Sequence, residues 1–131
     1  MEKQVDVAII GGGIAGITAG LYVKRSNLSV MAIDRNVFGG KLVKLGEIYN
    51  YPGFEAISGP ELAFKLMEQA DKNGIELEYG NVVNVTKRED NLFLVQTEEH
   101  MIRAKVVIIA TGTIEKQLGI PGEKELLNRG V

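Results

Sequence analysis

The 131-residue sequence contains no cysteine. The chain therefore carries no disulfide, no thiolate metal site and no redox-active dithiol of its own. Its apolar runs all fall short of the ~20 residues that a membrane-spanning helix needs. Because strand-forming residues begin within a few positions of Met1, there is no room for a signal peptide. These absences predict a cytoplasmic protein without a membrane segment.

The sequence also lacks a strong charge of either sign and has a single histidine. A formal net charge of −2 gives no electrostatic reason to expect nucleic acid or an anionic membrane as a partner. His100 lies in a polar stretch and is predicted to be an exposed turn residue. No Ser-His-Asp, metal-binding or paired-carboxylate pattern is present, so no catalytic side chain is predicted.

The first 34 residues have the pattern of a strand, a helix and a second strand. Val5–Ile10 is a short apolar run, typical of a strand buried on both faces. A helix follows and stops near Asn27, and the apolar run Leu28–Ile33 then ends on Asp34. This spacing predicts a right-handed βαβ unit. The buried face of its helix is predicted to consist of Ile14, Ile17, Thr18 and Leu21.

The remainder of the chain predicts a long loop, a helix and several strands. Residues 35–59 are rich in glycine and lack clean periodicity, and Pro60 then opens a helix. After a strand at 75–79, an antiparallel three-stranded meander is predicted, followed by a separate apolar strand at 106–110. Residues 1–131 are therefore predicted to form one α/β domain of Rossmann-like fold with a parallel sheet. The meander strands are predicted at 82–87, 92–97 and 101–104.

The sequence GGGIAG at residues 11–16 fits the pattern G-x-G-x-x-G through Gly11, Gly13 and Gly16. In this pattern the first glycine permits a tight turn, the second lets a pyrophosphate approach, and the third lets the helix lie close to the strand. Asp34 stands 23 positions after Gly11, where an acidic residue accepts hydrogen bonds from a ribose. The combination predicts dinucleotide binding. The alternative is a turn that merely packs helix on strand, which leaves Asp34 unexplained.

Arg35 bears on which dinucleotide binds. An arginine at this place can pair with the 2′-phosphate of NADP, but the carboxylate of Asp34 would repel that phosphate. We therefore predict a ligand with a free adenosine ribose, either NAD or FAD. Arg35 remains a candidate for cofactor contact, with a solvated side chain as the alternative.

A set of short motifs, in order along the chain, resembles the thioredoxin reductase family of low-molecular-weight pyridine nucleotide-disulfide oxidoreductases. The resemblance covers all 131 residues and is to the N-terminal FAD-binding segment of that family. It favours FAD over NAD. The motifs are GGGIAG at 11–16, GGKL at 39–42, NYPGF at 50–54, ATG at 110–112 and IPGE at 120–123.

The resemblance implies which residues contact FAD. Asp34 would accept hydrogen bonds from the adenosine ribose, and Val82 would contact the adenine through its backbone. Thr111 and Gly112 would close over the nucleotide. The pyrophosphate would be held by Gly11, Gly13, Ala15 and Gly16. The ribityl chain and flavin would lie along Gly39, Gly40, Lys41 and Leu42, with Asn50 hydrogen-bonded near the isoalloxazine.

Two positions depart from the family pattern. Lys41 replaces a glutamine, and its charge would either stabilise the anionic reduced flavin or extend into solvent. Tyr49 replaces a glutamate, and its ring would either contact the flavin or cover the core. The residues leave both questions open.

The last four residues, NRGV at 128–131, resemble the stretch that leads into the NADPH domain of the family and its Cys-x-x-Cys centre. We therefore expect a fragment that lacks the NADPH domain and a final sheet strand and is inactive alone. The parent is expected to be a homodimer that passes electrons from NADPH through FAD to a dithiol and on to thioredoxin. The alternatives are a ferredoxin–NADP reductase without the cysteine pair and a non-catalytic dinucleotide-binding module.

Overall fold

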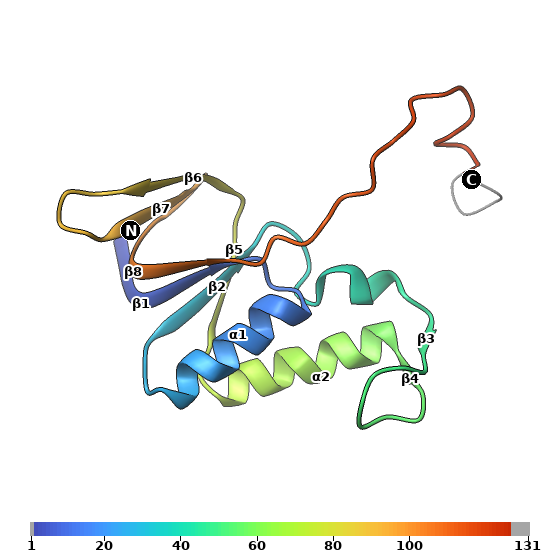
Figure 1. Cartoon of the computed structure of the whole chain (residues 1–131), viewed down its shortest axis with the longest axis horizontal. Coiled ribbons are helices and arrows are strands. Elements are labelled where there is room, and N and C mark those ends of the chain that lie inside the picture. Colours follow the sequence, from blue (N-terminus) through green and yellow to red (C-terminus); the bar gives the residue numbers. More distant parts are fainter. Residues whose placement is uncertain (1, 127–131) are drawn as a thin grey trace.

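The computed structural model describes residues 2–126, so the NRGV stretch lies outside the described residues. Two longer helices, a 3-10 helix (η1) and eight strands follow one another along the chain (Figure 1). In order they are β1 (Glu2–Ile10), α1 (Ile14–Arg25), β2 (Val30–Asp34), η1 (Gly40–Lys44), β3 (Glu47–Ile48), β4 (Ile57–Ser58), α2 (Gly59–Lys72), β5 (Glu76–Tyr79), β6 (Val82–Lys87), β7 (Phe93–Thr97) and β8 (Met101–Ile109).

Six strands form one mixed sheet in the order β5-β2-β1-β8-β7-β6. The first four of these run parallel, while β7 and β6 run antiparallel to their neighbours. Both α1 and α2 cover the same face of the parallel part, and the meander forms the other end of the sheet (Figure 1). The predicted Rossmann-like α/β fold, with its βαβ unit and meander, is confirmed.

The last strand differs from the prediction. Residues 101–104 and 106–110 were expected to form separate strands, but the single strand β8 runs from Met101 to Ile109. The charged residue between them, Lys105, lies within the strand, and its ammonium is 2.7 Å from the carboxylate of Asp6 on the neighbouring strand. The first part of β8 pairs with both β1 and β7, whereas residues 106–109 pair with β1 alone. Within the described residues, the outer edge of β8 at 106–109 therefore has no strand partner.

The two faces of the sheet each have an apolar core. Towards the helices, Ile9 and Ile17 are fully buried with Leu62 of α2, and towards the meander Met31 packs with Ile102. Burial on both faces was predicted for β1, where Val5 and Val7–Ile9 are buried, and β2 is buried on both faces as well. Leu28 lies outside it and is 40% exposed, so the predicted start of this strand was two residues early.

The helices are close to the prediction, with one correction. Thr18 is exposed, and the buried face of α1 passes through Gly16, Ile17 and Gly20. The reason is close packing, because a Cβ on Gly20 would lie only 2.9 Å from the side chain of Ile75. Asn27 has the predicted left-handed conformation, with φ +58°.

The glycine-rich stretch 35–59 was expected to be a loop but contains regular structure. It forms η1 and the two short strands β3 and β4, which pair antiparallel. Ser58 then caps α2 by accepting a hydrogen bond from the backbone N–H of Glu61, which confirms the helix start at Pro60 to within one residue.

Candidate dinucleotide site

Two of the three pattern glycines are required by the protein itself. Gly11 has φ +109°, and a Cβ there would lie 2.1 Å from the carbonyl oxygen of Ala110. A Cβ on Gly16 would lie 1.8 Å from the carbonyl oxygen of Gly11. Any side chain at either position would collide with backbone, so these glycines let the turn form and let α1 approach β1.

Gly13 differs from the other two. Its backbone is extended, with φ −76° and ψ −172°, which any residue adopts without strain. The nearest atom to a Cβ there would be the Cα of Gly40, at 3.9 Å. Neither strain nor a protein contact therefore requires glycine at this position. The space beside Gly13 fits a group from outside the chain that approaches the backbone closely.

The start of α1 next to Gly13 suits an anion. The helix has no side-chain cap and no acidic residue in its first turn. The first N–H groups of a helix have no partner within it, and the helix dipole favours negative charge there. Ala15 and Gly16 lie in this turn, so the predicted pyrophosphate residues are brought together.

Asp34 lies at the carboxyl end of β2, and its carboxylate is already bonded to the chain. Its Oδ2 accepts a hydrogen bond from the N–H of Gly12 at 2.7 Å, and its Oδ1 accepts one from the N–H of Asn36 at 2.9 Å. A carboxylate has about four acceptor positions. Two positions therefore remain for ribose hydroxyls. Asp34 also fixes the glycine turn, a role that the sequence pattern did not reveal.

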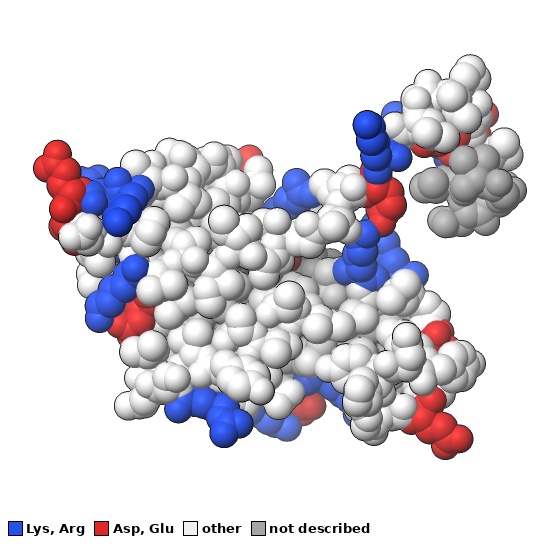
Figure 2. All heavy atoms as spheres, in the orientation of Figure 1, with Lys and Arg blue, Asp and Glu red and all other residues white. Residues whose placement is uncertain are grey.

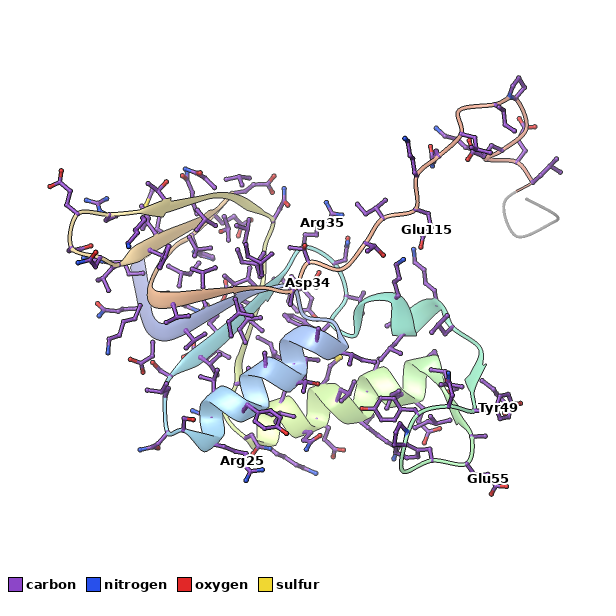
Figure 3. All side chains as sticks on the ribbon, viewed as in Figure 1. Arg25, Asp34, Arg35, Tyr49, Glu55 and Glu115 are labelled. Atoms are coloured by element: carbon purple, nitrogen blue, oxygen red, sulfur yellow. The ribbon has the colours of Figure 1, made fainter. Side chains whose placement is uncertain are left out.

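A cleft of about 430 Å³ opens at the carboxyl ends of β1, β2 and β8. Figure 3 shows Asp34 and Arg35 at this end of the sheet. Such an edge is where open α/β sheets bind ligands. The predicted residues that line the cleft are Gly11, Asp34, Arg35, Val82, Thr111 and Gly112. The lining residues that were not predicted are Ile10, Ile33, Gly80, Asn81 and Ile114.

The sequence position of Gly80 could have predicted that this residue lines the cleft. It directly follows β5, so parallel pairing places it at the same sheet edge as Asp34, and its N–H donates to the carbonyl oxygen of Asp34 at 2.9 Å. Ile114 gave no such signal, because it follows β8 within a stretch that has no regular structure.

The predicted flavin-side residues lie next to the glycine turn. The N–H of Gly39 donates to the carbonyl oxygen of Gly12 at 2.8 Å, and Gly40 faces Gly13. The side chain of Leu42 is buried in the core, and its backbone N–H donates to the carbonyl oxygen of Gly39. Asn50 is exposed in the loop between β3 and β4 and does not line the cleft.

Tyr49 and Lys41, which depart from the family pattern, both have acidic partners. Tyr49 is 69% exposed, so it does not cover the core, and its hydroxyl donates to Glu47, which raises the pKa of Tyr49. The ammonium of Lys41 pairs with Glu115 of the segment after β8. A hydrogen bond from Lys41 lowers the pKa of Glu115, and the charge of nearby Lys44 adds to this.

His100 lies in the turn between β7 and β8 and corrects one prediction. It was expected to be exposed, but its side chain is half-buried and its Nδ1 is fully buried without a hydrogen-bond partner. Its Nε2 lies 3.4 Å from Glu78, which also accepts a hydrogen bond from Lys3 at 2.9 Å. The side chain of His100 therefore packs against β5, while Glu98 and Glu99 of the same turn are exposed.

Residues 2–126 contain neither a metal-binding cluster nor a membrane-spanning helix. No cluster of three His, Asp or Glu side chains has an arrangement suited to a metal ion. None of the described helices combines the length and hydropathy required to cross a bilayer.

Known proteins share both the sequence and the fold. The chain is 45% identical to the thioredoxin reductase of Bacillus subtilis (strain 168) over 130 residues, which are 99% of this chain and 41% of that protein. The crystal structure of Lactococcus lactis thioredoxin reductase (FR conformation) superposes with a TM-score of 0.87 at 42% identity, covering 93% of this chain and 40% of that one. A ferredoxin-flavin thioredoxin reductase from Clostridium acetobutylicum gives 0.79 at 32% identity, covering 99% and 45%.

These matches confirm the resemblance to thioredoxin reductases that the motifs predicted. The chain spans about 40% of the length of the relatives that it matches. The family model for pyridine nucleotide-disulphide oxidoreductases matches residues 5–131. On that match, the chain belongs to the pyridine nucleotide-disulphide oxidoreductase family.

Proposed function

We propose that this chain is the FAD-binding portion of a thioredoxin reductase. The observation that carries the proposal is Gly13, a glycine that the protein needs neither for conformation nor for packing, at the unblocked start of α1. A pyrophosphate is the group that this arrangement accommodates best. The two acceptor positions left on Asp34 support a dinucleotide with a free adenosine ribose.

Each part of the chain would have a separate role in holding FAD. The start of α1, with Gly13, Ala15 and Gly16, would stabilise the charge of the pyrophosphate through backbone N–H groups, while Gly11, whose own N–H donates to the carbonyl oxygen of Ile33, would shape the turn beside it. Asp34 would orient the adenosine, with Val82, Thr111 and Gly112 as walls of its cleft. Gly39, Gly40, Lys41, Leu42 and Asn50 would lie on the flavin side. When bound, FAD would accept two electrons from a nicotinamide cofactor and deliver them to a disulfide.

The other functions belong to the proposed whole protein. They are an NADPH site, a Cys-x-x-Cys dithiol, reduction of thioredoxin, homodimer formation and a cytoplasmic location. The unpaired edge of β8 at residues 106–109 supports a further part, since Ile109 is 76% exposed there. An open apolar edge is usually covered in a native protein. A final strand from a longer chain would cover it.

A second candidate differs in the electron donor. One relative, at 32% identity, is named a ferredoxin-flavin thioredoxin reductase, so ferredoxin is an alternative to NADPH for this chain. A ferredoxin–NADP reductase without a cysteine pair remains the third reading, and a non-catalytic module the fourth. A Cys-x-x-Cys pair in a longer protein that contains this chain would favour the first two over the others.

Ligand titration of the 131-residue chain tests the proposal. FAD, NAD and NADP are compared by flavin fluorescence and thermal shift, and FAD is expected to bind most tightly. Gly13→Ala should weaken FAD binding by at least tenfold, because the added methyl group occupies the space for the pyrophosphate. Gly46→Ala is the matched control, since a Cβ there meets no protein atom within 4 Å and a Cβ on Gly13 meets none closer than 3.9 Å. Tighter binding of NADP, or unchanged FAD binding by Gly13→Ala, would refute the proposal.

A further inference from the structure

The segment that leaves β8 is joined to the rest of the chain by one ion pair. Lys41 of η1 contacts the carboxylate of Glu115 across 74 positions of sequence. Within residues 2–126, no other hydrogen bond or ion pair joins residues 111–126 to the preceding part. The position of the segment therefore depends on this pair.

That position matters because the segment forms part of the cleft wall. Thr111, Gly112 and Ile114 line the cleft, yet every residue from 111 to 120 is exposed, so burial does not hold the wall in place. Figure 3 shows Glu115 on the side of the segment that faces η1. Whatever holds Glu115 also sets where this wall lies.

The charges around Glu115 favour the contact. Glu115 faces both Lys41 and Lys44, and the hydrogen bond from Lys41 is the main cause of its lowered pKa. Figure 2 shows acidic atoms enclosed by basic ones where the segment passes η1. The carboxylate is therefore ionised at neutral pH. Because the side chains of Lys41 and Glu115 are 55% and 82% exposed, salt weakens their attraction.

We propose that Lys41 and Glu115 form an electrostatic clasp that holds residues 111–114 over the cleft and slows release of the bound dinucleotide. The proposal rests on the FAD function proposed above. It gives a reason for the departure from the family pattern at position 41, because a neutral glutamine there would form no ion pair with Glu115. Both are positioning residues here, acting through the wall of the cleft.

The first test measures the clasp without any ligand. Since the chain has no cysteine, Val37→Cys and Leu118→Cys place two spin labels at exposed sites, one before η1 and one after Glu115. In the labelled chain with Lys41 and Glu115 unchanged, the distribution of distances between the labels is expected to be narrow. It should become broad after Glu115→Gln or in ~1 M salt, where the Debye length is about 3 Å. The swap Lys41→Glu with Glu115→Lys should narrow it again. Distributions that stay unchanged in Glu115→Gln would overturn the clasp.

The second test measures the rate of FAD release, and the direction of the change in Glu115→Gln distinguishes two explanations. Glu115→Gln removes a negative charge near an anionic ligand, so a simple charge effect predicts slower release. Loss of the clasp predicts faster release, by up to about fivefold for an exposed pair. Glu55→Gln is the matched control, an exposed glutamate of equal charge far from the segment (Figure 3). Release that is slower or unchanged in Glu115→Gln contradicts the proposal.

The two tests separate this inference from the proposed function. A wild-type chain that binds NADP more tightly than FAD refutes the function, and the label distances still decide whether the pair holds the segment. A chain that binds FAD, with a release rate indifferent to Glu115→Gln, keeps the function and refutes the clasp.

Discussion

Replacing Asp34 tests whether its carboxylate fixes the glycine turn before any ligand binds. Asp34→Ala removes the acceptor for two backbone N–H groups, at 2.7 Å from Gly12 and 2.9 Å from Asn36. Asn36 is exposed, so water replaces the lost bond there at little cost. Gly12 is buried, so its N–H loses a bond to a charged group, worth about 1.5–3 kcal/mol. We expect the free energy of unfolding to fall by this amount.

Urea unfolding of the ligand-free chain, followed by circular dichroism, measures the effect. The midpoint should fall while the slope with denaturant stays constant, since the exposed surface is unchanged. Asp34→Asn should lose less, because one side-chain oxygen still accepts. Asp71→Ala, at an exposed position, is the control and should stay within about 0.5 kcal/mol of the original. A midpoint for Asp34→Ala equal to that of the control would show that the carboxylate does not hold the turn. Because Asp34→Ala is expected to destabilise the chain, any loss of FAD binding by this variant is compared with the change in its free energy of unfolding.

Two further predictions concern acid and activity. The pKa of Asp6 lies well below its ordinary value of 3.8, because Lys105 and then Ser29 donate hydrogen bonds to it. The stability that the ionised Asp6 provides is thus fully present above pH 3.8 and is lost as the pH falls further. Asp6→Asn should therefore make the free energy of unfolding depend less on pH below 3.8. Equal pH dependence in the variant and the original chain would contradict this. The 131-residue chain, given FAD, NADPH and a chromogenic disulfide, should show no turnover above free flavin, and steady chain-dependent reduction would mean that a catalytic group has been overlooked.

Local patterns predicted the parts of the molecule that depend on neighbouring residues. The spacing of glycines before a helix, with Asp34 after the next strand, located the turn and one wall of the cleft. Periodicity located α1, α2 and most strands within a few residues. These features were predictable because backbone conformation and burial follow from residues close in sequence.

Contacts between distant residues were not predictable from these patterns. The pairing of Lys41 with Glu115 and of His100 with Glu78 depends on where the fold brings separate elements together. Thr18 fits the helical period but is exposed, because close packing at Gly20 places the glycine side of α1 against the core. The helical period of apolar residues defines the buried face of a helix only to within about one residue. Packing then decides which of two neighbouring residues is buried.

The pairing of β1 with β8 has a consequence for how the chain folds. The strand β1 is an inner strand of the sheet, and it aligns Glu2 with Met101, which lies 99 positions further along the chain. Such long-range parallel contacts impose a high loop-closure entropy and slow folding. During synthesis, the backbone groups on one edge of β1 therefore remain unpaired until residues 101–109 have left the ribosome. Conditions that slow elongation within the meander would prolong this exposure, and an unpaired strand edge favours aggregation of an incompletely folded chain.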